Sequence, residues 1–322
     1  MRVNLIYHDN GAGTPRTAGI VANVLAQAGA ITTHSVTPRP SLARWASAVL
    51  GRAVRRPHYD LNIFLEQVRP RWLPSARRNV LVPNQEWFDP SWLPHLPAFD
   101  LVLTKTRYAE QRFRALGATV SYIGFTSEDR RMRPAPPPVD GVLHLAGRSL
   151  QKGTDAILEV WSRRPDWPTL TVVQRPPHPG YPLDHPELPN VVYRTDRVPD
   201  SELQQLQNAH QLHLCPSLAE GFGHTLVESM SCGAVLITTD GPPMNELVQP
   251  DRGILVAAKA AERQGVGQLY RADPQALEGA IDGALRLPAE ERERLGVHAR
   301  TWFEVNDAAF RNRLRGVLGE LG

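Results

Sequence analysis

Few of the usual markers of a membrane-spanning, exported or disulfide-bonded protein occur in this 322-residue sequence. No stretch approaches the about 18 consecutive apolar residues of a membrane span, and the N-terminal apolar run is too short for a signal peptide. The only cysteines, Cys215 and Cys232, lack metal-like spacing, and we expect buried free thiols in a reducing compartment. These absences predict a cytoplasmic protein.

The sequence also has little net charge. The formal net charge is only +3, with 21% charged and 42% hydrophobic residues, which is ordinary globular composition. Two stretches, 39–57 and 69–78, have a local surplus of arginine. The first interleaves apolar side chains and is compatible with peripheral contact to anionic lipid at the inner membrane face or to a nucleic-acid backbone. We favour a solvated helix face, since +3 is a modest charge for a duplex binder.

Short apolar runs recur along the whole chain, with helical patterns in several of the gaps. Near-continuous runs of this kind are typical of strands buried on both faces of parallel sheets. They predict an α/β protein with two Rossmann-like domains facing across a cleft. The runs are VNLIYH, LNIFLE, NVLVPN, FDLVLTKT and TVSYIGF in the first half, and GVLHLAG, LTVVQ, NVVYRT, HQLHLCPS, AVLITTD and GILVA in the second.

The domain boundaries follow from proline and from the tail. Residues 130–141 contain a proline tract that suits an extended hinge between domains. The tail is helical almost throughout and is interrupted near Pro288. We predict a first domain over 1–135, a second over 136–305, and a helix over 306–322 that packs back on the first domain.

Two loops in the second half carry groups suited to a phosphorylated ligand. A strand ends at Gly147, and Arg148 and Lys152 follow before a helix capped by Thr154 or Asp155. Cations at the carboxyl edge of a sheet make a good clamp for a diphosphate.

The other loop, LAEGFG, lies between the strand HQLHLCPS and the helix HTLVESMSC. Backbone N–H groups at the start of this helix suit an anion. Glu220 lies before the loop, and Glu228 lies about a turn into the helix. The order carboxylate, donors, carboxylate matches a hydroxylated ring, a diphosphate and a second hydroxylated ring, which describes a nucleotide sugar.

These segments resemble a known family. EGFGHTLVE, followed by SMSCGAVLITTD and GPPMNELV, is similar to the E-x7-E region of retaining glycosyltransferases with the GT-B fold, of the family-4 (group 1) type. GRSLQKG resembles the G-R-x-x-x-K-G segment of the same family. The resemblance covers residues 141–256 and is only architectural over the first domain.

The resemblance implies roles for individual residues. Arg148 and Lys152 hold the donor diphosphate and offset charge on the leaving group, while Glu220 meets hydroxyls of the transferred sugar. Glu228 takes the ribose hydroxyls. Donor-binding residues are then Gly147, Gly221, Phe222, Gly223, His224, Thr225, Leu226 and Glu228.

His224 and Thr225 depart from the apolar residue and proline most common after EGFG, which leaves the sugar open. His224 is either a sugar or phosphate ligand or a solvated residue at the helix start. No convincing D-x-D site occurs, so no metal cofactor is expected, because cations of the protein can take the metal's part. The resemblance implies front-face attack by the acceptor, without a side-chain nucleophile.

The first domain is expected to supply the acceptor side. A glycine-rich loop after the first strand places His8, Gly11 and Gly13 near a helix start, although a tight turn alone also explains the glycines. A later strand ends near Asn84, Glu86 and Trp87. Aromatic residues here could stack on sugars or grip a lipid, or simply pack under a proline-rich loop.

The sequence thus predicts transfer of a hexose-type sugar from a nucleoside-diphosphate sugar to a hydroxyl. A glycan or lipid-linked intermediate of a cell-surface polysaccharide is the favoured acceptor, and modified DNA or a small molecule are alternatives. Two other classes with the same fold stay open: a sugar-nucleotide epimerase, and a non-catalytic nucleotide-sugar binder.

Overall fold

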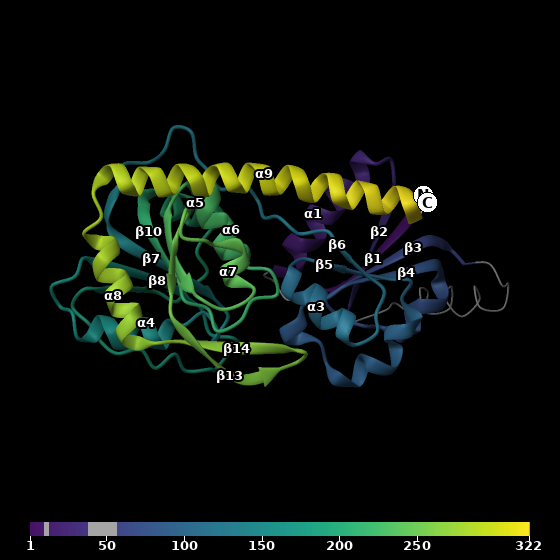
Figure 1. Ribbon diagram of the computed structural model, residues 1–322, viewed down its shortest axis with the longest axis horizontal. Helices are drawn as coiled ribbons and strands as arrows, with labels where there is room; N and C mark the ends of the chain where they lie inside the picture. Colours follow the sequence, from purple (N-terminus) through teal and green to yellow (C-terminus); the bar gives the residue numbers. More distant parts are fainter. Residues whose placement is uncertain (10–12, 38–56, 322) are drawn as a thin grey trace. The chain divides into compact units, whose positions relative to one another are not determined.

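The computed structural model describes residues 1–9, 13–37 and 57–321 (Figure 1). The chain divides into two compact units. Unit 1 comprises Met1–Ser127, Gln264–Gly267 and Asn306–Gly322, and unit 2 comprises Glu128–Arg263 and Gln268–Val305. The sequence predicts a first boundary after residue 135, whereas unit 1 ends at Ser127. Gly11 and nearly all of the basic stretch 39–57 lie outside the described residues.

Unit 1 is built on a parallel sheet of six strands in the order β2-β1-β3-β4-β5-β6. Of these, β2 escapes prediction because its sequence, ITTHSVT, is polar and lies at a sheet edge. Its strands are β1 Arg2–His8, β2 Ile31–Thr37, β3 Tyr59–Leu65, β4 Ala76–Val82, β5 Leu101–Thr104 and β6 Val120–Tyr122; its helices include α1 Gly13–Gln27, η1 Pro70–Ser75, η2 Gln85–Trp87, η3 Pro90–Ala98 and α3 Arg107–Ala115.

Unit 2 contains a second parallel sheet, in the order β12-β11-β10-β7-β8-β9. All six strands coincide with apolar runs of the sequence, so the α/β prediction with two parallel sheets is confirmed. Its strands are β7 Val139–Gly147, β8 Thr169–Gln174, β9 Val191–Arg194, β10 His210–Cys215, β11 Val235–Thr239 and β12 Ile254–Val256; the helices are α4 Thr154–Ser162, α5 Asp200–Ala209, α6 His224–Cys232, α7 Met244–Leu247, α8 Pro274–Leu285 and α9 Ala289–Leu321.

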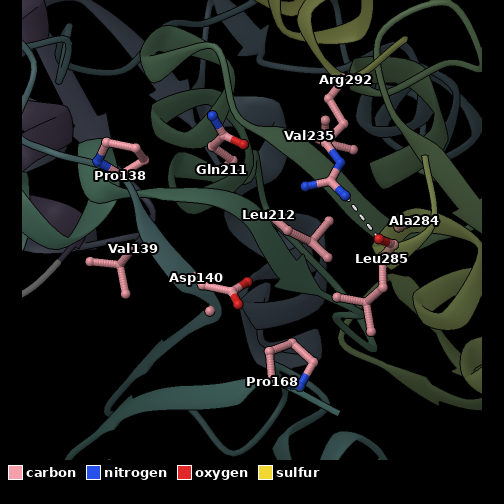
Figure 2. A pocket seen from close by; sticks show the side chains of 11 residues that line it. Pro138, Val139, Asp140, Pro168, Gln211, Leu212, Val235, Ala284, Leu285 and Arg292 are labelled. Atoms are coloured by element: carbon pink, nitrogen blue, oxygen red, sulfur yellow. Dashed lines mark hydrogen bonds between the residues drawn. The ribbon is translucent and has the colours of Figure 1, made fainter. Parts of the chain in front are cut away.

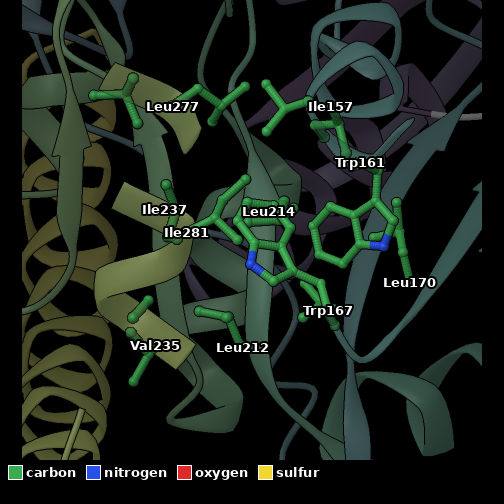
Figure 3. Close-up of a cluster of buried hydrophobic side chains, with 14 of the residues drawn as sticks. Ile157, Trp161, Trp167, Leu170, Leu212, Leu214, Val235, Ile237, Leu277 and Ile281 are labelled. Carbon is green, nitrogen blue, oxygen red and sulfur yellow. The ribbon is translucent and has the colours of Figure 1, made fainter. Parts of the chain in front are cut away.

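Aromatic packing stabilises one face of this second sheet. Trp161 on α4 and Trp167 meet edge to face, with ring centroids 4.8 Å apart, against Leu214 and other buried aliphatic side chains (Figure 3). Buried aromatic pairs of this geometry stabilise beyond their area alone. This cluster holds α4 against β10, so the loop that enters α4 and the loop that leaves β10 have a rigid base.

In each sheet, the strand order reverses at one point. After β7 the chain continues to β8 and β9 on one side and then returns to β10 on the other side of β7. In unit 1 the same reversal occurs at β1, which lies between β2 and β3. Loops leaving the carboxyl ends of the two central strands diverge at such a point, which is where open α/β sheets bind ligands.

A hairpin of polar sequence was not predicted. It consists of β13 Ala258–Gln264 and β14 Gly267–Ala272, and neither strand has a continuous apolar run in its sequence. The residues at its tip, Gln264–Gly267, group with unit 1, where the Val266 N–H donates to the Gln85 carbonyl at 2.8 Å.

The end of the chain follows the predicted helical pattern. The break near Pro288 separates α8 from α9, and Asn306–Gly322 groups with unit 1. There, Asn306 donates its Nδ2–H to the Phe125 carbonyl at 2.7 Å. The Phe310 ring packs against the Phe125 ring with centroids 4.7 Å apart. None of the helices in the described residues is both long and apolar enough to cross a membrane.

Two smaller expectations need correction. Arg130, placed in an extended hinge by the sequence, is 3% exposed and belongs to unit 2, where its backbone N–H donates to Ser231 Oγ at 2.9 Å. Both cysteines are free thiols, but only Cys215 is buried, whereas Cys232 is partly exposed. Burial raises the pKa of each thiol to about 12, so both are protonated at neutral pH.

Candidate functional site

The loops after β7 and β10 are joined at the point where the sheet of unit 2 reverses. The Leu218 N–H of one loop donates to the Gln151 carbonyl of the other at 2.8 Å. Gly153 has a φ of 76°, and a Cβ at this position would lie 2.2 Å from the Pro216 carbonyl oxygen. Only glycine permits this approach, and it brings the predicted cations and Glu220 to one edge.

Gly153 is also the N-cap of α4, which corrects the predicted cap at Thr154 or Asp155. The Thr154 hydroxyl instead lies 2.9 Å from Nε2 of the buried His144. His144 Nδ1 lies 2.8 Å from the Leu214 carbonyl oxygen and so donates to it, which makes Nε2 an acceptor. Burial lowers the pKa of His144 to about 4, so the imidazole is neutral at pH 7. It ties β7 to β10 beneath the site.

Lys152 and Glu220 form an ion pair at this edge. The ammonium donates to Glu220 Oε1 at 2.5 Å, and the Ser217 hydroxyl donates to the same oxygen at 2.7 Å. Both side chains are largely buried, with 16% of Lys152 and 9% of Glu220 exposed. The Glu220 carboxylate is therefore held by two donors. It holds the Lys152 ammonium near the loop that leads into α6 His224–Cys232.

Arg148 differs from Lys152 in its surroundings. It follows Gly147, the last residue of β7, and both residues are exposed. Within the described residues, the guanidinium makes no ion pair. It is therefore accessible to an anion at the same sheet edge.

Helix α6 presents its amino end to this edge. It begins at His224 after Gly223, whose φ is 107° and whose missing Cβ leaves room for Leu226. Its first turn contains no acidic residue, so the positive end of the helix dipole is not compensated there. Phe222 is buried, while His224 and Thr225 are partly exposed, and the Phe222 and His224 rings meet edge to face.

Glu228 lies in the second turn of α6 and is 2% exposed. Gln207 of α5 donates its Nε2–H to Glu228 Oε2 at 3.0 Å, and Arg130 donates its Nε–H to Gln207 Oε1 at 2.8 Å. Although burial opposes the Arg130 charge, its hydrogen bond to Asp200 and the charge of Glu228 raise its pKa. These two hydrogen bonds fix the Glu228 carboxylate. No sequence pattern around Gln207 or Arg130 predicts them.

The predicted acceptor-side residues lie in unit 1. His8 ends β1 and is partly exposed, and Gly13 is the first described residue of α1. Asn84 and Glu86 follow β4, with Glu86 buried at 4% exposure and Trp87 exposed at 56%. The neighbouring Phe88 is fully buried against Phe113 and Trp92, so the packing interpretation holds for Phe88.

A separate cavity of about 300 Å³ lies at the amino ends of the strands of unit 2 (Figure 2). Asp140, Leu212 and Val235 line it together with Arg292, whose guanidinium donates to the Leu285 carbonyl at 2.8 Å. None of the predicted site residues lines this cavity. The candidate site is at the opposite, carboxyl edge, where loop backbone and charges converge.

Comparison with known protein families gives a match within the second half of the chain. Residues 183–302 match the family model "Glycosyl transferases group 1", a range that contains Glu220, α6 and Glu228. No curated protein matches the sequence significantly.

Several solved structures share the fold over nearly the whole chain. A glycosyltransferase from Rickettsia africae matches with a TM-score of 0.71 at 13% identity, covering 99% of this chain and 97% of that one. The sucrose-phosphate synthase of Thermosynechococcus elongatus gives 0.72 at 16%, covering 100% and 99%. Anabaena HepE, in complex with UDP and glucose, gives 0.69 at 16%, covering 99% of each chain. These likenesses establish the GT-B fold.

The close approach at Gly153 generates the first prediction. Gly153→Ala combines a left-handed backbone with a clash against Pro216, and should lower the free energy of unfolding by about 2–5 kcal/mol. Gly147→Ala is the matched control, because its φ is 59° but its Cβ would meet nothing within 4 Å. It should cost only about 1–2 kcal/mol. Urea denaturation followed by circular dichroism measures both, and equal losses would refute the steric argument.

Proposed function

We propose that this chain, which carries a group 1 glycosyl transferase domain, is a retaining glycosyltransferase. It transfers a hexose-type sugar from a nucleoside-diphosphate sugar to a hydroxyl. One observation carries the proposal. Glu220, the amino end of α6 and Glu228 follow one another along the chain from the carboxyl end of β10, and Lys152 forms an ion pair with Glu220.

The donor would lie along this series of groups. Glu220 accepts hydrogen bonds from hydroxyls of the transferred sugar, and the N–H groups from Gly221 to Leu226 approach the diphosphate. Glu228, fixed by Gln207, accepts hydrogen bonds from the ribose hydroxyls. HepE binds UDP and glucose, and a neighbouring trehalose-phosphate synthase of Burkholderia xenovorans is UDP-forming, so UDP-glucose is the first donor to test.

The two cations would serve the leaving group. The Lys152 ammonium is paired with Glu220, and a diphosphate would offer a second, more highly charged anion to the same ammonium. Arg148, accessible on the adjoining loop, supplies a fork of donors. As the bond from the sugar to the diphosphate breaks, these charges and the helix dipole stabilise the departing nucleoside diphosphate. A metal ion is not needed for this charge balance.

The reaction would proceed on one face of the sugar. The acceptor oxygen bonds to the anomeric carbon as the bond to the phosphate oxygen breaks, and the acceptor proton moves to that departing oxygen. Configuration is then retained without a covalent enzyme intermediate. Glu220 suits a role in positioning, because Lys152 and Ser217 both donate to its Oε1. The acceptor we propose is a glycan or lipid-linked intermediate of a cell-surface polysaccharide.

Glu228 should determine nucleotide affinity. Glu228→Ala removes a charged hydrogen-bond acceptor, which is typically worth about 1.5–3 kcal/mol, so the Kd should rise about ten- to hundred-fold. Gln207→Leu should weaken binding in the same direction by releasing the carboxylate. Isothermal titration with UDP, GDP and ADP identifies the base and measures the effect. Glu293→Ala, on an exposed face of α9, is the control. Unchanged affinity in Glu228→Ala would refute the ribose assignment.

Removal of either cation should slow turnover. Lys152→Ala and Arg148→Ala should each lower the rate of donor hydrolysis by about two to three powers of ten, the range for a preorganised electrostatic group. Lys259→Ala, an exposed lysine of β13, controls for loss of a positive charge. The assay follows release of nucleoside diphosphate from UDP-glucose, GDP-mannose and ADP-glucose. Wild-type rates in both variants would contradict the proposed clamp.

Chelation tests the proposed independence from metals. Because Arg148 and Lys152 supply the positive charge, hydrolysis and transfer should continue at about the same rate in excess EDTA. The measurement is repeated after dialysis and after addition of Mg²⁺ or Mn²⁺. Complete loss of activity that returns with the metal would overturn this part of the proposal.

A further inference from the structure

The sheet of unit 1 has its own reversal point, between β1 and β3, and polar groups meet there. Thr14, in the first turn of α1, donates its hydroxyl to Glu66 Oε2 at 2.9 Å. Glu66 directly follows β3, so this bond connects it to the first turn of α1, the helix that comes after β1. By the rule that locates ligands in open α/β sheets, this edge is a second place for a ligand.

Glu66 has an unusual backbone. Its φ is 67°, and it alone among the described residues other than glycine has a positive φ. The Gln67 N–H donates across it to the Leu65 carbonyl at 2.8 Å, which makes the tight γ-turn with positive φ. Such a conformation costs on the order of 1–3 kcal/mol for a residue with a Cβ. Glycine would remove this strain, yet a carboxylate stands here.

Lys105 is the second unusual residue of this edge. It directly follows β5 and is 3% exposed. The carboxylates of Glu66 and Glu86 act on its charge electrostatically, and the Phe125 ring centroid lies 5.4 Å from Nζ. Burial lowers the pKa of Lys105, and the two carboxylates oppose that shift. Within the described residues the ammonium makes no hydrogen bond, and although the side chain is buried, its nitrogen is not completely shielded from solvent.

An ammonium carries three donors, and burying them without acceptors is unfavourable. Glu66 and Glu86 compensate the positive charge of Lys105, but its N–H donors still need acceptor oxygen atoms, which a ligand can supply. Sugar hydroxyls match this need, because each offers an acceptor to the ammonium and a donor to a carboxylate.

We propose that Lys105, Glu66 and Glu86 form an acceptor-binding site in unit 1 for an uncharged, polyhydroxylated sugar. The assignment as acceptor rests on the proposed glycosyl transfer, whereas sugar binding does not. With all three groups ionised, the cluster carries one positive and two negative charges. A phosphorylated sugar would bring about 1.5–2 further negative charges against the two carboxylates, and should be rejected.

Two variants separate a ligand-binding role from a structural one. Glu66→Gly relieves the positive φ, and Lys105→Met replaces a buried ammonium by an apolar chain of similar length. Glu66→Gly relieves strain but loses the Thr14 hydrogen bond, and Lys105→Met removes a buried ammonium but also its attraction to the two carboxylates. Because these effects oppose each other, the midpoint of urea denaturation should change little in either variant. Glu293→Gln and Lys259→Met, both at exposed positions, are matched controls. A marked loss of stability in both test variants would indicate a structural cluster and overturn the proposal.

Binding to the full chain is measured by saturation-transfer NMR without any donor. The probes are methyl glycosides of glucose, galactose, mannose, rhamnose and N-acetylglucosamine, with glucose 6-phosphate for comparison. At least one uncharged glycoside should bind, glucose 6-phosphate should not, and both test variants should weaken binding at least about ten-fold. Binding of no uncharged glycoside, preference for the phosphate, or unchanged binding in the variants would overturn the proposal.

Donor hydrolysis measured on the same preparations distinguishes sugar binding from a role as acceptor site in glycosyl transfer. Hydrolysis that equals wild type in Glu66→Gly and Lys105→Met, together with a raised KM for the bound glycoside, supports an acceptor role. If the wild-type chain binds a glycoside but hydrolyses none of the three donors, sugar binding stands and the transferase proposal fails.

Discussion

The candidate donor site depends on the contact between Gly153 and Pro216. Because a Cβ at Gly153 would lie 2.2 Å from the Pro216 carbonyl oxygen, the loops after β7 and β10 can run against each other only with glycine at that position. The hydrogen bond from Leu218 to Gln151 then fixes their register. Lys152 reaches Glu220 as a consequence, and the amino end of α6 begins next to this pair. Without that approach, Lys152 and Glu220, which belong to different loops, would lie apart.

The two glutamates of the candidate site, Glu220 and Glu228, are both buried but have different hydrogen-bond partners. Glu220 is paired with a cation and a hydroxyl, whereas Glu228 is held by an amide that is itself held by Arg130. The first arrangement can exchange partners when an anion arrives, because the lysine stem is flexible. The second is anchored through several bonds and suits a fixed reference point for a ligand. The site therefore combines one adaptable carboxylate with one rigid carboxylate.

Apolar runs were sufficient to predict every strand of the six-stranded sheet of unit 2, because strands buried on both faces must be continuously apolar. The same criterion could not find β2 or the hairpin β13–β14, whose polar sequences lie at an edge or outside the main sheets. Motif spacing located Glu220 and Glu228, but Gln207 and Arg130 act through tertiary contacts that leave no local pattern. The sequence predicts Thr154 or Asp155 as the cap of α4, since side-chain oxygens of these residue types commonly cap helices, but Gly153 is the N-cap and the Thr154 hydroxyl contacts buried His144.

The division of the chain has a consequence for dissecting and recombining this protein. The polypeptide passes from one unit to the other at 127/128, 263/264, 267/268 and 305/306. A single cut therefore cannot release either unit as one continuous fragment. A chimaera that joins residues 1–127 to the second half of another enzyme would leave the Gln85 carbonyl without the Val266 N–H that it accepts here. A swap of unit 1 must therefore carry the four residues of the hairpin tip and the last turns of α9 together with residues 1–127.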